Sequence, residues 1–237
     1  MPALNAAPPL KITVAPEVHD LAPGFVPLVV EARGLTNGPS DERSSALLDD
    51  AVRRLTGRLA GRAPHEDPHL IAWREAYTAF GAKPSRTRNS AEALARRAVA
   101  DGGLPRINLL VDLYNAVSVA HLLPVGGEDT DHIHGGMRLV RANGAETFET
   151  AAGGEPVIEH PEPGEVVWQD DTGVTCRRWN WRQGVRTRLT GDSVNAVFLL
   201  ERLAPMPLDA LHAAGNELAE GLRQLCPAAK VTVRDAG

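Results

Sequence analysis

The sequence has few of the features by which an enzyme is usually recognised. Its only cysteines, Cys176 and Cys226, lie far apart, so it has no disulfide framework and no Cys-x-x-Cys motif. It also lacks a Walker-type phosphate loop, a Gly-x-Gly-x-x-Gly turn, a Gly-x-Ser-x-Gly nucleophile elbow and a His-Glu-x-x-His zinc motif. These absences exclude most standard enzyme classes, and we expect no cofactor.

Long apolar runs are also missing. No uninterrupted apolar stretch approaches the roughly 18 residues of a membrane-spanning helix, and the segment 107–123 is broken by Asp112, Asn115 and His121. The N-terminus shows no basic segment followed by an apolar run, which is the pattern of a signal peptide. We therefore expect a soluble, cytoplasmic protein without a membrane partner.

The charge balance is mildly acidic. The 30 acidic and 25 basic residues give a formal net charge of −5, so the whole molecule is not a general binder of polyanions, and DNA is not an expected partner. The stretch 177–188 differs because it contains arginines and no acidic residue. These arginines form either a solvated surface or a contact for nucleic acid; they are Arg177, Arg178, Arg182, Arg186 and Arg188.

The N-terminal half is predicted to be mostly helical. Two strands, at 11–15 and 25–33, are separated by a loop rich in proline and glycine. Ser40 or Asp41 then caps a helix that ends between 57 and 64. The further predicted helices are 68–80, one that is capped by Asn89 and ends at 102, and one that opens at Pro105.

After Pro124 the sequence changes to short runs rich in β-branched residues, separated by glycine-containing turns. This spacing predicts an antiparallel meander, followed by a helix over 208–226 and a final edge strand over 230–236. The predicted strands of the meander are 136–142, 146–151, 164–170, 173–179 and 195–201.

Helices gathered in one region and strands in another predict an α+β fold, with a mostly helical N-terminal half packed on antiparallel sheet. No internal repeat or long linker divides the chain, so we expect one domain over 1–237. Its predicted parts are a β and helical part over 1–123, a β-rich part over 124–203, and a helix and strand over 204–237.

One short segment contains several potential metal ligands. Asp129, Asp131, His132 and His134 lie close together, and alternate residues of a strand would share a face. No further ligand follows at a recognised spacing. This pattern favours a polar turn before a strand, and we expect no metal site.

The segment 177–183 has two tryptophans, Trp179 and Trp181. If the segment is a strand, they share one face, with Arg178, Asn180 and Arg182 on the other. The tryptophans either enter a core that is poor in aromatic residues or line a pocket for a base or an amino-acid ring. The sequence pattern leaves both possibilities open.

The central segment contains a pattern of residues that is specific in order and spacing. These residues are Pro105, Ile107, Asn108, Val111, Asp112, Asn115, Pro124, Asp129, Asp131, Gly135 and Gly136. On this pattern the chain over 94–146 is similar to the B3/B4 editing domain in the beta chain of bacterial phenylalanyl-tRNA synthetase, and a looser similarity continues to about 201. The N-terminal ninety residues and the segment 177–183 resemble the stand-alone members of this family.

The resemblance implies a function and a partner. The B3/B4 domain hydrolyses the ester that joins a wrong amino acid, such as tyrosine, to the terminal adenosine of tRNA. An aminoacyl ester is already activated, so one positioned water and one polarised carbonyl suffice, and no covalent nucleophile is needed. The implied protein is a trans-acting editing hydrolase whose partner is the acceptor end of an aminoacyl-tRNA.

The resemblance also suggests the site residues. Asn115 matches a pocket asparagine of the family, Gly126 stands where the family has a histidine, and Arg182 and Gln183 fall near the acidic residue that reads the tyrosine hydroxyl. The candidate catalytic residues are Asn115, Gly126 and Gln183; the candidate substrate-binding residues are Asp112, Gly127, Glu128, Trp179, Asn180, Trp181 and Arg182; the candidate tRNA-binding residues are Lys83, Arg86, Arg88, Arg177 and Arg178.

Two other functions remain open at this point. Because Gly126 replaces the family's histidine, the same pocket is also compatible with a module that binds an amino acid, a nucleoside or tRNA without cleaving it. A scaffold that docks on a translation protein is the third possibility. The sequence does not specify the amino acid, the tRNA or the oligomeric state.

Overall fold

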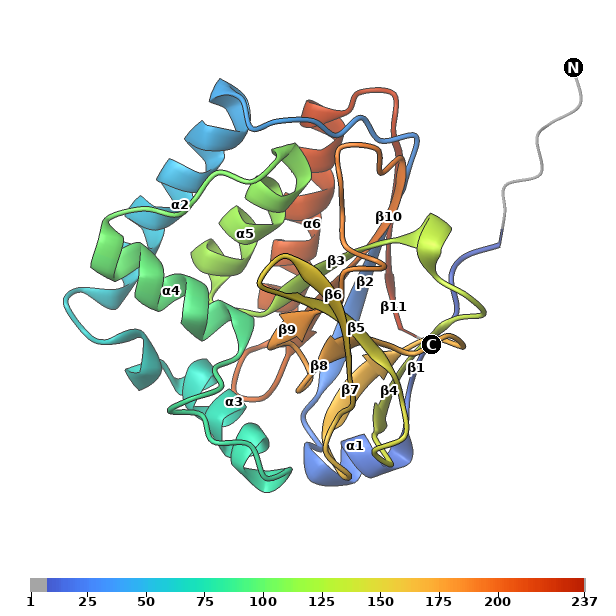
Figure 1. The fold of residues 1–237 in the computed structure, drawn as a ribbon. Coiled ribbons are helices and arrows are strands. Elements are labelled where there is room, and N and C mark those ends of the chain that lie inside the picture. The colour runs from blue at the N-terminus through green and yellow to red at the C-terminus, as the bar shows by residue number, and fades with distance from the viewer. Residues whose placement is uncertain (1–7, 237) are drawn as a thin grey trace, which may run out of the picture.

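The computed structural model describes residues 8–236 and has an α+β architecture, which confirms the predicted fold class (Figure 1). Residues 1–7, where the sequence predicts no signal peptide, lie outside the described part. Among the described residues, no helix is long and apolar enough to cross a membrane. The helices are α1 (Pro16–Leu21), α2 (Glu42–Leu59), α3 (Pro68–Ala79), α4 (Ser90–Asp101), α5 (Leu109–His121) and α6 (Leu208–Leu225), with short 3-10 turns η1 (Pro64–Glu66) and η2 (Thr130–His132).

Within residues 8–236 the strands form three sheets. A five-stranded sheet has the order β1-β4-β7-β8-β9, a four-stranded sheet has the order β11-β2-β10-β3, and β5 pairs with β6 in a separate hairpin. The strands are β1 (Ile12–Val14), β2 (Val26–Arg33), β3 (Val125–Asp129), β4 (Met137–Arg141), β5 (Phe148–Ala152), β6 (Glu155–Glu159), β7 (Val166–Gln169), β8 (Val174–Arg177), β9 (Arg182–Gln183), β10 (Asn195–Arg202) and β11 (Lys230–Asp235).

The four-stranded sheet is buried on both faces. Alternate residues of a strand point to opposite faces, so Phe198 and Leu200 of β10 pack toward α5 and α6, whereas Val197 and Leu199 pack toward the core that contains Trp73, Trp168 and Trp179. Burial on both faces explains the continuous apolar runs of β2 and β10.

Local capping signals set the helix starts. The Asp41 carboxylate accepts hydrogen bonds from the backbone N–H groups of Arg43 and Ser44, and Asn89 accepts one from Glu92 N. The fourth predicted helix does not open at Pro105. It begins at Leu109, because Asn108 is the cap and accepts a hydrogen bond from Val111 N at 2.9 Å.

The predicted meander is wrong in part. β10 does not continue the sheet of β4, β7 and β8; it lies between β2 and β3 in the other sheet, and β1 pairs in parallel with β4. The predicted edge strand is confirmed as β11. The sequence pattern also misses α1, which begins at a proline, as well as β3 and β6, which begin among glycines.

Two helical glycines differ in what surrounds them, and this difference gives a test of the fold. A Cβ at Gly215 in α6 would lie 2.3 Å from Leu28 Cδ2, whereas a Cβ at Gly57 in α2 would meet nothing within 4 Å. We expect Gly215→Ala to lower the free energy of unfolding by about 1–2 kcal/mol through overpacking. We expect Gly57→Ala to raise it by about 0.5–1 kcal/mol. Urea denaturation measures both, and equal stabilisation by the two substitutions would contradict the packing of α6 on β2.

Candidate functional site

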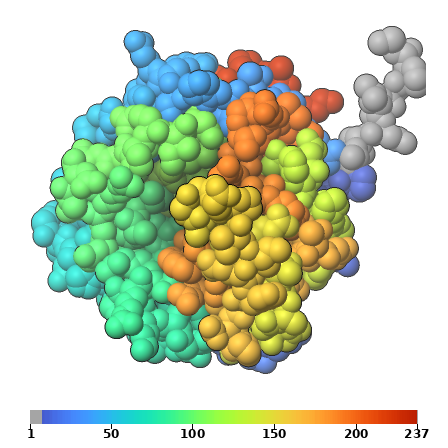
Figure 2. Space-filling view, viewed as in Figure 1, coloured from blue at the N-terminus to red at the C-terminus, as the bar shows by residue number. Residues whose placement is uncertain are grey.

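A cavity of about 290 Å³ lies where the helical half meets the strands. Its walls come from α4, α5, β3, β10 and the turn between β8 and β9. Figure 2 shows the face on which the β5–β6 hairpin, in yellow, lies beside the helices in green. The predicted site residues that line this cavity are Asn115, Gly126, Glu128, Trp179, Asn180, Trp181, Arg182 and Gln183.

Asn115 lies on α5 and is only 7% exposed. Among the described residues its side-chain amide forms no hydrogen bond with protein atoms. Ser118, about one helical turn further along α5, differs because its Oγ donates a hydrogen bond to Leu123 O at 2.7 Å. A buried amide needs hydrogen-bond partners. The Asn115 amide is therefore available to hold a water molecule or a substrate atom in the cavity.

Gly126 lies in β3 opposite Leu199 of β10. A Cβ built on Gly126 would meet nothing within 4 Å, so this position borders open space. Gly127 is different, because its Cβ would lie 2.9 Å from Leu189 and 3.0 Å from Phe198. Gly127 therefore packs against the core and does not line the cavity, although its carbonyl accepts a hydrogen bond from Gln183 Nε2 at 2.6 Å.

Glu128 places a carboxyl group in the wall of the cavity. It is 4% exposed, and its Oε2 accepts hydrogen bonds from Gln183 Nε2 at 2.7 Å and from the Thr187 hydroxyl. Burial raises the pKa of Glu128 to about 8, despite these hydrogen bonds. Both of these donors meet Oε2, which leaves Oε1 to carry the proton, and the Thr175 side chain is a further hydrogen-bond partner of the carboxyl group.

A second buried carboxyl group, Glu201, also lines the cavity. It is 2% exposed, and its two oxygens accept hydrogen bonds from Trp168 Nε1 and Asn180 Nδ2, each at 2.9 Å. Asn180 in turn accepts a hydrogen bond from the Tyr77 hydroxyl at 2.8 Å. Burial raises the pKa of Glu201 to about 7.

Glu201 is a site candidate that the sequence motifs do not suggest. The usable signal is the strand period, because an acidic residue that shares a face with Val197 and Leu199 is expected to enter the interior. A charged residue in such a place needs hydrogen-bond partners or a function. Without the tertiary structure, nothing distinguishes Glu201 from a charged residue at a strand end.

The segment 177–183 is not one strand, and the two tryptophans do not share a face. β8 ends at Arg177, and the chain turns through left-handed conformations at Arg178 (φ 46°) and Trp179 (φ 67°) before β9 begins. Trp179 is fully buried against Phe25 and Trp73 and forms the inner wall of the cavity. The Trp181 ring is partly buried, and the guanidinium groups of Arg178 and Arg182 both contact it, with Cζ to ring centroid distances of 4.6 and 4.9 Å.

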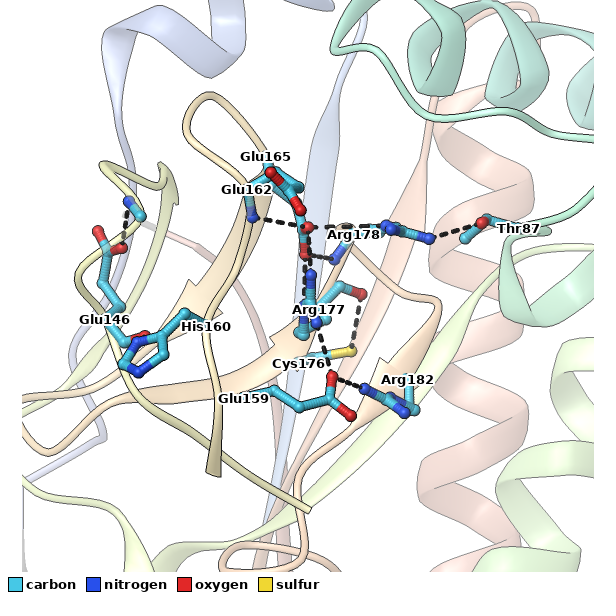
Figure 3. Close-up of polar contacts among 11 residues, drawn as sticks. Thr87, Glu146, Glu159, His160, Glu162, Glu165, Cys176, Arg177, Arg178 and Arg182 are labelled. Carbon is cyan, nitrogen blue, oxygen red and sulfur yellow. Dashed lines mark hydrogen bonds and ion pairs between the residues drawn. The ribbon is translucent and has the colours of Figure 1, made fainter. Parts of the chain in front are cut away.

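Two predicted binding residues are occupied by internal contacts. Asp112 is fully buried and accepts hydrogen bonds from Ser44 Oγ at 3.0 Å and Ile107 N at 2.9 Å, so it joins α2 to α5 and does not line the cavity. Arg177 donates twice to Glu165 and once to Glu159, and its side chain is 7% exposed (Figure 3). Arg177 is therefore not available for a tRNA phosphate.

The remaining predicted cations lie beside the cavity. Lys83, Arg86 and Arg178 line a separate cavity of about 280 Å³. Arg88 does not line it, and its Nε lies 3.6 Å from Glu92 Oε1. Arg186 and Arg188 of the arginine stretch have different surroundings. The Arg186 side chain forms an ion pair with the buried Asp170, whereas the Arg188 backbone forms an isolated antiparallel β-bridge with Glu128. The stretch 177–188 thus does not form one continuous basic surface.

The Asp129 to His134 segment forms a hydrogen-bonded turn. Asp129 accepts hydrogen bonds from Asp131 N at 3.0 Å and from Ser193 Oγ at 2.6 Å, and His132 Nδ1 lies 3.5 Å from its carboxylate. Within residues 8–236, no group of three or more His, Cys, Asp or Glu side chains is arranged to hold a metal ion. The geometry fits the polar-turn interpretation of this segment.

Comparisons with known proteins identify a family and a structural likeness. A family model described as the B3/4 domain matches residues 72–226. No curated protein sequence matches the chain. The fold is similar to the crystal structure of an N-terminal fragment of the phenylalanyl-tRNA synthetase beta-subunit from Pyrococcus horikoshii, with a TM-score of 0.45 and 13% identity; the match covers 96% of this chain and 54% of the fragment, so the chain spans about half of the fragment's length.

The raised pKa of Glu128 predicts a pH-dependent loss of stability. Between about pH 5 and 8 the unfolded chain ionises Glu128 near its ordinary pKa of 4.5, while the folded protein keeps it protonated up to about 8. The unfolded state then binds fewer protons, so stability falls as pH rises, by at most about 1.4 kcal/mol per pH unit for one group. We expect Glu128→Gln to gain stability relative to the wild type across this range.

Urea denaturation at several pH values measures this effect, with Glu75→Gln as the matched control because Glu75 is exposed on α3. The control should keep the pH dependence of the wild type. If the Glu128→Gln and wild-type curves ran parallel from pH 5 to 8, the assignment of a protonated carboxyl group would be wrong.

Proposed function

The chain belongs to the B3/4 domain family, and on this basis we propose that it is a trans-acting hydrolase that removes wrongly attached amino acids from tRNA. The observation that carries the proposal is that Asn115, Gly126 and Gln183, from three different elements, border one cavity together with two buried carboxyl groups. The partner is then the acceptor end of an aminoacyl-tRNA, and the compartment is the cytoplasm.

The proposed reaction needs no covalent nucleophile. A water molecule attacks the carbonyl carbon of the aminoacyl ester, the bond to the ribose oxygen breaks, and a proton passes from the water to that oxygen. Asn115 is suited to orient the water, because its amide has no protein partner among the described residues and lies in the cavity wall. Protonated Glu128 is suited to donate a hydrogen bond to an oxygen that gains negative charge.

The cavity also has a platform for a base. Trp181 is partly exposed at the cavity wall, and two guanidinium groups hold its ring in place. Aromatic rings bind unpaired bases by stacking, regardless of the base. We assign the Trp181 ring to the terminal adenosine.

The buried end of the cavity supports a choice among amino acids. Glu201 provides acceptor oxygens beside Trp168 and Leu199. Each oxygen already accepts one hydrogen bond and has a second lone pair, so a side chain with a hydrogen-bond donor gains a bond there that an apolar side chain of equal size does not. We therefore propose that the edited amino acid carries a donor group on its side chain.

The proposal is tested with a panel of tRNAs, each charged with a different amino acid. We expect release of amino acid above the buffer rate for some members of the panel, and faster release for side chains with donor groups than for apolar side chains of equal size. The measurement is the fraction of labelled amino acid that remains on tRNA over time. Absence of release for every amino acid, with folded protein, would contradict a hydrolase.

The matched variants for this assay are Asn115→Ala and Ser118→Ala, both on α5. Asn115→Ala should slow turnover by about 100-fold if its amide positions the water, and should leave thermal stability nearly unchanged because no protein hydrogen bond is lost. Ser118→Ala removes the hydrogen bond to Leu123 O outside the cavity and should show the reverse pattern. Unchanged turnover in Asn115→Ala would remove Asn115 from the site.

A binding module without hydrolysis is the second candidate, and Gly126 is the observation that favours it. The resemblance places a histidine at this position, and here the backbone borders open space. In that case amino acids or adenosine analogues should raise the melting temperature, and the tRNA panel should show no turnover. Turnover in the panel would exclude this candidate.

A further inference from the structure

A second cavity borders the same turn as the first, because Arg178 lines it and the next residues, Trp179 to Trp181, line the first. It has a volume of about 280 Å³ and lies between the loop after α3 and the turn before β7. Lys83 and Arg86 come from the loop, Glu162 and Glu165 from the turn, and Arg178 lies between them. Figure 3 shows Arg178 reaching from the Glu165 side toward Thr87.

Positive charge exceeds negative charge in this cavity. Lys83 and Arg86 are exposed, and neither forms an ion pair with any residue from 8 to 236. Glu165 is buried and already holds two hydrogen bonds from Arg177, at 2.9 and 2.8 Å. Glu162 is then the one exposed acidic group that opposes the cations lining this described cavity.

Hydrogen bonds to other residues of the protein order Arg178 without a ligand. Its backbone N–H donates to Glu165 Oε1 at 3.0 Å, and its Nη1 donates to Thr87 Oγ1 at 2.7 Å. A guanidinium that is already ordered loses less freedom when it binds a phosphate oxygen. Its Nη2 has no protein partner in the described part of the chain, which leaves a donor for a ligand.

Arg178 also links the two cavities. Its guanidinium lies 4.6 Å from the centroid of the Trp181 ring, and Trp181 lines the first cavity. A single-stranded nucleic acid whose terminal base stacks on Trp181 therefore brings its backbone toward Arg178. Lys83 and Arg86 line the second cavity together with Arg178.

We propose that the cavity lined by Lys83, Arg86 and Arg178 binds a backbone phosphate of single-stranded RNA, next to the nucleotide whose ester occupies the first cavity. This assignment rests on the proposed function, since it treats the two cavities as parts of one site for the acceptor end of tRNA. The required chemistry is a phosphodiester on a flexible strand, which cationic side chains and a stacking platform recognise together.

The test compares two double variants. Lys83→Met with Arg86→Met removes two cations from the cavity, and Arg53→Met with Arg223→Met removes two cations from α2 and α6, where the side chains are 70% and 49% exposed. Both double variants lose two positive charges, so a difference in RNA affinity between them depends on where the lost cations lie and not on net charge. Thermal melting checks that both fold as the wild type does.

The binding arm uses uncharged tRNA and a fluorescent single-stranded RNA that ends in CCA. We expect the Lys83 and Arg86 variant to bind at least tenfold more weakly than the control, and the slope of log affinity against log salt to fall by about 0.7 for each lost phosphate contact. Equal affinity of the two variants would overturn the proposal. Competition by inorganic phosphate as strong as by the RNA would also overturn it, because the cavity would then be a general anion site.

The kinetic arm uses aminoacyl-tRNA and aminoacyl-adenosine, which has no phosphate. The variant should lose at least tenfold in kcat/KM on aminoacyl-tRNA, through KM, and keep the wild-type kcat/KM on aminoacyl-adenosine. An equal loss on both substrates would overturn the proposal. If the wild type hydrolyses neither substrate, the proposed function fails, whereas the binding arm still decides whether the cavity binds RNA.

Discussion

The carboxylate of Glu165 holds the turn on which both cavities depend. It accepts hydrogen bonds from Arg177 Nε and Nη2 and from the backbone N–H of Arg178, and it is almost fully buried. These contacts stabilise two consecutive residues, Arg178 and Trp179, in the left-handed region of backbone conformation, where residues other than glycine are disfavoured. A buried carboxylate that lost its arginine would cost several kcal/mol, so this contact keeps the turn in one conformation.

The geometry of this turn decides where each of its side chains goes. The reversal at Arg178 and Trp179 sends Trp179 into the core, turns Asn180 toward Glu201 and leaves Trp181 at the cavity wall. A straight strand would have placed the two tryptophans together and Asn180 on the opposite face. The same turn presents Arg178 to the second cavity, so the two cavities are neighbours because they share one piece of backbone.

The four-stranded sheet sets the depth of the first cavity. Leu199 and Glu201 of β10 lie on its inner face, and β3 lies next to β10 with Gly126 opposite Leu199. Because a glycine has no side chain, the strand leaves space there without a change of backbone. Burial raises the pKa of Glu128 to about 8 and that of Glu201 to about 7, which makes the cavity less negatively charged near neutral pH than its composition indicates.

The sequence by itself determined the features that depend on neighbours along the chain. Caps such as Asp41 and Asn89, the apolar periods of the helices and the apolar run of β10 are local, and they were sufficient for the fold class. Asn115, Gly126 and Glu128 became cavity candidates through the family resemblance of the segment around them. Only the tertiary structure decided that β10 lies between β2 and β3, that Arg177 and Asp112 are internal, and that Glu201 lines the cavity. These features depend on contacts between distant segments, such as Glu165 with Arg178 and Asn180 with Glu201, and the period of a sequence carries no information about which segments meet.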